Sequence, residues 1–373
     1  MKSGDKPYIW QQRDWPRWVF DTKPLARLLA QVHRAQGYLL GRMVDLGLDL
    51  RDQALLRILT EDVLNTSEIE GEILNADSVR SSIARRLGVD VGGLASTDRK
   101  VEGVVDMVLD ATQRHRMPLT AERLFGWHAA LFPTGYSGLA KIKVGAWRDD
   151  ALGAMQVVSG PLHRQTVHYQ APAASLLDAE MAEFLKWFNH AQAEDPVLCA
   201  GLAHLWFVTI HPFDDGNGRI ARAVGDMALA RAEDTTYRYY SLSAQIQKER
   251  KAYYERLEAT QKGGMDVTAW LEWFLSCLLR AIQGAEQTLE SVLAKARFWQ
   301  QQAGLPFNAR QLKLLNKLLD GFEGKLTTTK WAAIAKCSQD TALRDITELI
   351  ERGALKKSEA SGRSTSYELL LAR

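Results

Sequence analysis

The sequence predicts a mainly α-helical protein with one inserted β-hairpin and a small C-terminal domain. Three observations predict this class. Apolar residues recur every three or four positions through most of the chain, strand-like alternation is confined to residues 141–159, and the last ~70 residues have their own order of short elements. The 373 residues, 46% hydrophobic and 25% charged, suffice for two or three domains and exclude a disordered chain.

Helical periodicity defines the elements of the main body in chain order. Leu25, Leu28, Leu29 and Val32 fall on one helical face, and the same spacing recurs in four later segments. These segments are residues 55–63, 179–188, 196–209 and 270–289. Glycine-rich breaks at residues 88–93 and 135–138 interrupt the helical pattern. No run approaches ~20 apolar residues, so a membrane-spanning helix is not expected.

One segment of the body predicts β structure. Residues 141–147 alternate between polar and apolar side chains, residues 148–153 form a polar turn, and residues 155–158 resume the alternation. Alternation with a period of two indicates a strand that is buried on one face. The segment from Lys141 to Ser159 therefore predicts a β-hairpin with a loose turn.

The C-terminal region predicts a winged helix-turn-helix domain. Behind a linker at residues 300–306, helices are expected at residues 311–319, 330–336 and 340–352, and a strand at residues 367–369. Residues 306–373 contain 12 basic and 8 acidic side chains, so this region carries +4 while the whole chain carries +2. The basic side chains Arg344, Lys356, Lys357 and Arg363 would lie on the recognition helix and the wing, which permits DNA contact without requiring it.

Cysteine usage and the N-terminus indicate a cytoplasmic protein. The three cysteines, Cys199, Cys277 and Cys337, are odd in number and far apart, as expected for reduced thiols. The first seven residues lack the apolar stretch of a secretory signal. We therefore expect a cytoplasmic location and no membrane partner.

Twelve contiguous residues carry the chemistry, His211-Pro-Phe-Asp-Asp215-Gly-Asn217-Gly-Arg219-Ile-Ala-Arg222. Pro212 stops the preceding helix and leaves His211 at an exposed break. Gly216, Asn217 and Gly218 can turn their backbone N–H groups into one concavity where the next helix begins. Arg219 and Arg222 add two positive charges to that helix N-terminus, so the segment predicts an anion site suited to phosphates.

Two side chains complete a site for attack on phosphorus. His211, with an ordinary pKa near ~6.5, can accept a proton at neutral pH. Asp215 is an oxygen ligand suited to Mg²⁺, which binds one or two carboxylates together with phosphate oxygens. A base, a phosphate cradle and a Mg²⁺ ligand together favour in-line attack of a hydroxyl on a phosphorus atom.

These twelve residues resemble the signature of the Fic (filamentation induced by cAMP) family, His-Pro-Phe-x-(Asp/Glu)-Gly-Asn-Gly-Arg-x-x-Arg, at every defining position. The wider resemblance covers roughly residues 10–296. It implies an N-terminal helical region at 1–95 and a helical Fic core at 96–296 with a β-hairpin flap, ahead of the winged helix-turn-helix domain that the element pattern predicts at 306–373. Most members transfer AMP from ATP to a Ser, Thr or Tyr hydroxyl of a protein and release pyrophosphate.

The resemblance implies a role for each residue of the signature. His211 would deprotonate the target hydroxyl, and Asp215 would hold Mg²⁺ between the α- and β-phosphates. Gly216, Asn217 and Gly218 would line the anion hole, and Arg219 and Arg222 would bind the outer phosphates. The flap would hold a target segment by main-chain pairing. Tyr253 and Tyr254 would build the adenine pocket.

A second motif resembles the inhibitory sequence of the family, Ser/Thr-x-x-x-Glu-Gly/Asn. It comprises Thr66, Glu70 and Gly71, and its place before the signature implies a class II member. In this interpretation Glu70 pairs with Arg222 and withholds that arginine from the γ-phosphate.

Three functions follow as hypotheses. The first is a Mg²⁺-dependent protein adenylyltransferase that uses ATP, modifies a protein hydroxyl (its own included) and is inhibited by Glu70. The second is a hydrolase that removes AMP with the same residues, and the third is a DNA-binding regulator that acts through the winged helix. Family members often form homodimers, and no feature of this sequence decides that point.

Overall fold

A computed structural model describes residues 8–44, 48–89, 95–151, 153–161, 164–190, 194–319, 322, 324–358 and 365–370. The chain divides into two compact units, Met1–Ala285 and Glu286–Arg373. The division falls inside the long helix α11 (Thr268–Gln301), earlier than the linker expected at 300–306. No proline interrupts this helix, so helical structure continues through the division. No helix among the described residues is long and apolar enough to cross a membrane.

The first unit begins with a series of helices, several of which start at a polar capping side chain. They are η1 (Ile9–Gln11), α1 (Thr22–Val44), α2 (Leu48–Ile69), α3 (Ala76–Leu87), α4 (Arg99–Gln113) and α5 (Ala121–Leu131). The side chains of Asn75, Asp98 and Thr120 accept backbone N–H groups in the first turns of α3, α4 and α5. The helices predicted at 25–32 and 55–63 are confirmed and extend further in both directions.

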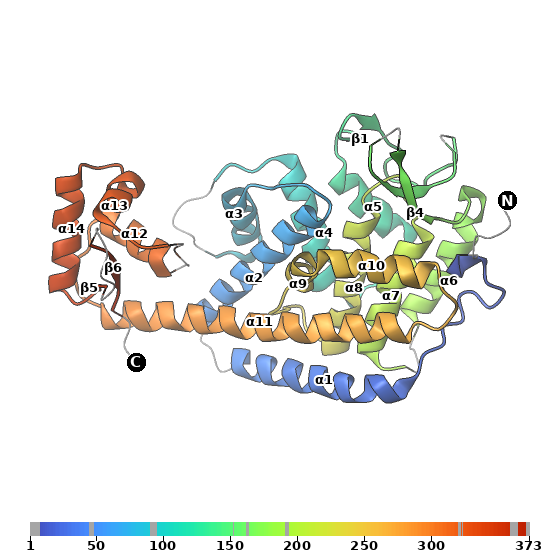
Figure 1. The fold of residues 1–373 in the computed structure, drawn as a ribbon, viewed down its shortest axis with the longest axis horizontal. Coiled ribbons are helices and arrows are strands. Elements are labelled where there is room, and N and C mark those ends of the chain that lie inside the picture. The colour runs from blue at the N-terminus through green and yellow to red at the C-terminus, as the bar shows by residue number, and fades with distance from the viewer. Residues whose placement is uncertain are drawn as a thin grey trace. The chain divides into compact units, whose positions relative to one another are not determined.

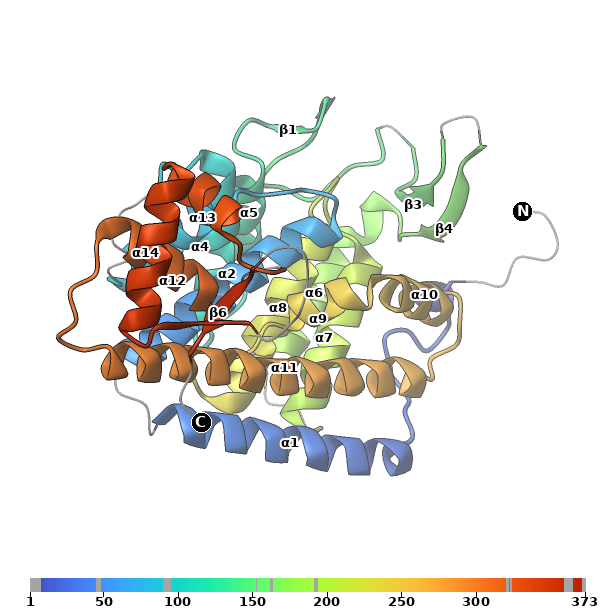
Figure 2. The same cartoon turned by 60° about the vertical axis from the view of Figure 1, so that its left-hand side comes forward.

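The strand predicted at residues 155–158 is confirmed at Gln156–Ser159, but its partner and the rest of the β structure in this unit differ from the prediction. Two small antiparallel hairpins form, β1 (Tyr136–Ser137) with β2 (Ala140–Lys141), and β3 (Gln156–Ser159) with β4 (Thr166–Gln170). The predicted pairing of 141–147 with 155–158 is wrong. The intervening backbone contacts the segment after α7 instead, because the N–H of Lys143 donates to Asp214 Oδ2 (2.8 Å) and the N–H of Arg148 to the carbonyl of Pro212 (2.9 Å). Figures 1 and 2 show both hairpins at one edge of this unit.

The centre of the first unit is a helix pair. The remaining helices that begin in this unit are η3 (Ala174–Leu176), α6 (Leu177–Asn189), α7 (Pro196–Ile210), α8 (Asn217–Glu233), α9 (Leu242–Lys248), α10 (Arg250–Gln261) and α11. Helix α7 is buried around almost its whole circumference, as its uniformly apolar sequence favours. Helix α8 packs against α2, α4, α5 and α7. Helix α8 is therefore held by several elements at once.

The second unit has its own core. Its elements after α11 are α12 (Ala309–Leu319), α13 (Thr328–Ala335), α14 (Gln339–Glu351), β5 (Leu355–Lys357) and β6 (Tyr367–Leu369), and β5 pairs antiparallel with β6. Trp331, Leu314, Ile346 and Leu349 are fully buried in one cluster. The element positions match the sequence prediction to within about two residues, while the winged helix-turn-helix assignment and its DNA contact stay predictions. Arg363, one of the proposed wing residues, lies outside the described residues.

A glycine sets the spacing between α4 and α5. A Cβ at residue 103 would lie 1.8 Å from the carbonyl oxygen of Ala130, which is backbone and cannot rotate away. We expect Gly103→Ala to lower the free energy of unfolding by about 3 kcal/mol, because the two helices must separate. Gly126→Ala on α5 is the matched control, since a Cβ added at that position would meet no atom within 4 Å. Equal urea midpoints for the two variants would contradict this close packing.

Candidate active site

The signature forms the connection between α7 and α8. His211 ends α7 in the left-handed conformation (φ 53°), and its N–H still donates to the carbonyl of Phe207. Asn217, buried at the start of α8, closes the loop: its side-chain oxygen accepts the N–H of Phe213 (2.9 Å) and its amide nitrogen donates to the Phe213 carbonyl (2.8 Å). The Asn217 side chain is thus a clamp on the loop, and its backbone N–H at the start of α8 can contribute to an anion hole.

His211 is held as a neutral base. Its Nδ1 lies 3.2 Å from the carbonyl oxygen of Val208. A carbonyl only accepts, so Nδ1 carries the hydrogen and Nε2 keeps the basic lone pair. Burial lowers the pKa of His211 to about 4, and the nearby positive charge of Arg148 acts in the same direction. The imidazole is therefore neutral throughout the neutral pH range, with the lone pair on Nε2 free.

Arg148 is a site residue that the sequence analysis missed. Its side chain is completely buried, and Nε donates to the carbonyl oxygen of His211 (2.8 Å). Its Nη2 donates to the carbonyl of Pro172, and Nη1 pairs with Asp150 (3.0 Å). Arg148 thus ties the loop that carries His211 to the segments before β3 and after β4. The only sequence signal was an arginine at the start of a turn that we expected to be solvated.

Glu70 lies over the N-terminus of α8, where the sequence predicts an anion site. Gly216 caps α8 at φ 79°, and a Cβ on Gly218 would lie 2.1 Å from Glu70 Oε1. Glu70 Oε1 also accepts a hydrogen bond from Arg222 Nη2 (2.7 Å). A carboxylate therefore lies where the helix dipole and a buried guanidinium both favour negative charge.

Thr66 also binds Arg222. The buried Thr66 hydroxyl accepts from Arg222 Nε (2.8 Å), and the Thr66 carbonyl accepts from Nη2 (2.9 Å). Gly71, the last residue of the Thr66–Gly71 motif, has a positive φ of 81°. Arg222 and Arg219 are each only 2% exposed. Arg222 Nη1 and Arg219 Nε have no well-formed hydrogen bond among the described residues, so both arginines keep buried donors for another ligand.

Asp215 fits the expected Mg²⁺ ligand. Its Oδ1 accepts the N–H of Gly216 (2.6 Å) and its Oδ2 accepts the hydroxyl of Ser137, which orients the half-buried carboxylate and leaves lone pairs on both oxygens. No group of three or more potential metal-ligating side chains occurs among the described residues. One carboxylate suits Mg²⁺, which completes its shell with water and phosphate oxygens.

The two tyrosines differ in their environments. Tyr253 is buried, and its hydroxyl lies 2.9 Å from His204 Nε2, so its ring belongs to the packed interior. Tyr254 is 40% exposed, and its hydroxyl donates weakly to the carbonyl of Ile69 (3.4 Å), next to Glu70. Of these two tyrosines, Tyr254 is the one with an exposed ring beside Glu70 and the phosphate site predicted there.

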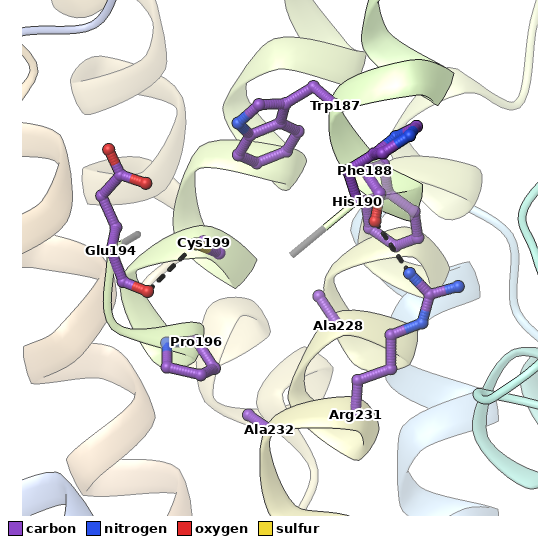
Figure 3. A pocket seen from close by; sticks show the side chains of 9 residues that line it. All are labelled: Trp187, Phe188, His190, Glu194, Pro196, Cys199, Ala228, Arg231 and Ala232. Carbon is purple, nitrogen blue, oxygen red and sulfur yellow. Dashed lines mark hydrogen bonds between the residues drawn. The ribbon is translucent and has the colours of Figure 1, made fainter. Parts of the chain in front are cut away.

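A pocket of about 230 Å³ lies away from this site. Figure 3 shows its lining, where Arg231 donates to the Phe188 carbonyl. The lining residues are Trp187, Phe188, His190, Glu194, Pro196, Cys199, Ala228, Arg231 and Ala232. They come from the end of α6, the start of α7 and the end of α8, whereas the signature lies at the opposite ends of α7 and α8, roughly 20 Å away at 1.5 Å per residue.

Three neutral histidines make stability dependent on pH. Burial lowers the pKa of His128 and His211 to about 4 and that of His204 to about 3. In the unfolded chain these groups take up protons near pH ~6.5, so the contribution of these histidines to the free energy of unfolding should fall as the pH drops from about 6.5 to about 4. Urea midpoints at pH 7.5 and 5 measure this slope. His204→Gln should flatten it, and an unchanged slope would contradict the assignment.

Comparison with known proteins agrees with this geometry. Residues 118–229 match the Fic/DOC family, and residues 8–89 match a domain of unknown function, DUF4172. The crystal structure of a Fic family protein from Desulfovibrio desulfuricans has the same fold, with a TM-score of 0.54 at 20% identity over 94% of this chain and 96% of that one. The chain therefore contains a Fic/DOC domain, which confirms the resemblance found in the sequence.

Two curated relatives are nucleotidyl transferases by name. The protein adenylyltransferase Fic of Drosophila ananassae is 25% identical over 226 residues, 58% of this chain and 39% of that protein. The uridine 5'-monophosphate transferase of Xanthomonas campestris pv. campestris is 33% identical over 121 residues, 31% of this chain and 21% of that protein. The chain spans about two fifths or less of the length of these relatives.

Proposed function

We propose that this protein transfers AMP from ATP to a hydroxyl group of a protein, and that Glu70 inhibits the transfer. The observation that carries the proposal is the pair of buried arginines, Arg219 and Arg222, which keep unpaired donors next to a neutral His211. A buried donor without a partner costs free energy unless a ligand satisfies it. A chain of phosphate oxygens is the ligand whose charge and acceptors match these groups.

In this mechanism the residues of the site mainly position the reacting groups and neutralise the charge of the phosphates. The target hydroxyl gives its proton to His211 Nε2 as its oxygen bonds to the α-phosphorus, and pyrophosphate leaves with the bridging oxygen. Arg148 holds the His211 backbone, and Asn217 holds the loop. The N-terminus of α8 and the two arginines neutralise the phosphates. Asp215 would hold Mg²⁺, which supplies further neutralisation of the phosphate charge.

Glu70 supplies the proposed inhibition. Its carboxylate pairs with Arg222 and occupies the space above Gly218, so a phosphate oxygen at that position would meet a like charge. The Glu70–Arg222 ion pair would keep the phosphate chain out of this position until Glu70 moves away. Removal of AMP by the same residues stays an alternative, since a hydrolase would use the same base and the same phosphate site.

The deciding experiment compares ATP labelled on the α-phosphate with ATP labelled on the γ-phosphate. Wild type and Glu70→Gly are incubated with Mg²⁺ and a cell lysate, and protein-bound label is measured. Label that comes from the α-phosphate and not from the γ-phosphate supports AMP transfer. UTP labelled on the α-phosphate is run in parallel, because one relative is named for UMP transfer. Label from UTP and not from ATP would reassign the transferred group, and no label from either would refute nucleotidyl transfer.

A further inference from the structure

A second carboxylate of the same chain turn contacts the signature. Glu72 Oε2 accepts a hydrogen bond from Arg219 Nη1 (2.8 Å), and Glu72 Oε1 lies 3.0 Å from the ammonium of Lys100 on α4. The Arg219 side chain is 2% exposed and that of Glu72 is 24% exposed. The first signature arginine is therefore paired with an acidic side chain, just as the second is paired with Glu70.

The end of α2 explains why two acidic side chains separated by one residue both reach α8. The N–H of Gly71 donates to the carbonyl of Glu68 (2.9 Å), and the N–H of Glu72 donates to the carbonyl of Ser67 (3.0 Å). These two bonds, with Gly71 at φ 81°, form a Schellman motif, in which the chain reverses at the glycine. Arg219 and Arg222 lie one helical turn apart, so each arginine faces one carboxylate.

We propose that Glu72 is a specificity-determining residue of the phosphate site, which withholds Arg219 from a nucleotide's terminal phosphates independently of Glu70. This inference rests on the proposed function. Arg219 is otherwise anchored by packing: its guanidinium carbon lies 5.0 Å from the centre of the Phe132 ring, and its Nε has no well-formed partner among the described residues. Glu72 is the anion that occupies Nη1, the donor that a phosphate oxygen would otherwise take.

Because of these charges, the effect of Glu72 on nucleotide affinity should depend on the number of phosphates in the nucleotide. Glu70 and Glu72 each pair with one arginine, so the two guanidinium groups offer a phosphate chain little net positive charge beyond the α8 dipole. Each carboxylate that leaves restores one full positive charge in a buried position. A triphosphate gains more from that charge than a monophosphate, because it carries more negative charge and reaches further along the site. Lys100 keeps Glu72 oriented when Glu70 alone is displaced.

Nucleotide binding by the full chain tests this role without requiring transfer. We would measure the dissociation constants of ATP and AMP with Mg²⁺ for wild type, Glu70→Gly, Glu72→Gln and the double variant. Glu72→Ala in the Glu70→Gly background repeats the test with the side chain removed. Glu68→Gln is the matched control, because Glu68 lies exposed on the same helix end.

We expect the double variant to bind ATP about tenfold more tightly than Glu70→Gly, as for the loss of one competing charge-assisted bond, with a much smaller change for AMP. If Glu70→Gly binds ATP and neither Glu72 substitution tightens that binding, the role of Glu72 is overturned while the proposed function stands. Equal tightening for ATP and AMP would also overturn that role. No ATP binding by any variant would overturn the proposed function together with this inference.

Discussion

Replacement of His211 by alanine should abolish AMP transfer while leaving ATP binding intact. General-base catalysis contributes roughly 10²- to 10⁴-fold, so in the Glu70→Gly background the rate of α-label transfer should fall by at least about a hundredfold. The reason is local: His211 Nδ1 is tied to the Val208 carbonyl, which leaves Nε2 as the basic nitrogen, and the low pKa of about 4 keeps the imidazole neutral.

The matched control for His211→Ala is His190→Ala. His190 is exposed at the end of α6 and lines the pocket at the far ends of α7 and α8. The His190→Ala variant should transfer label at the parental rate. The dissociation constant for ATP, measured on both variants, separates loss of the base from loss of the phosphate site. Transfer by His211→Ala at the parental rate would refute its role as the base.

Replacement of Glu70 by glycine should raise AMP transfer about 10- to 100-fold, which is the range expected when one charge-assisted hydrogen bond no longer competes with the substrate. The substitution frees Arg222 Nη2 from the carboxylate at 2.7 Å and clears the space over Gly218. Arg222 stays oriented, because the hydroxyl and carbonyl of Thr66 both still accept from it. The measurement is the initial rate of α-label incorporation.

Glu68→Gly separates the loss of the carboxylate from a loosened helix end. Glu68 lies two residues earlier on the exposed side of α2, so the same change in backbone freedom is made without touching Arg222. We expect this control to keep the low rate of the wild type. Equal rates for wild type and Glu70→Gly would refute inhibition by Glu70, and equal activation by Glu68→Gly would assign it to the helix end in general.

The contiguous parts of the site could be predicted from the sequence because their geometry is local. Pro212 and the glycines on either side of Asn217 dictate a helix end, a tight loop and a new helix start within twelve residues. The main helices were predicted for a similar reason, since a buried face repeats every three or four residues. The pairing of Glu70 with Arg222 was also predicted, but through the resemblance to the Fic family and not through spacing.

Contacts between distant residues could be decided only by the tertiary structure. The hairpin is displaced because Arg148 is buried against the carbonyl of His211, 63 positions away, and periodicity contains no information on such a contact. The pairing of Glu72 with Arg219 joins residues 147 positions apart, and the contact of Tyr253 with His204 buries a ring that the sequence could equally have placed at a nucleotide. The sequence by itself determined the chemistry of the α7–α8 connection, because its parts are neighbours in the chain. Packing of α2, α10 and the segment around Arg148 against that connection decided which side chains hold the base, which neutralise the arginines and which lie in the core.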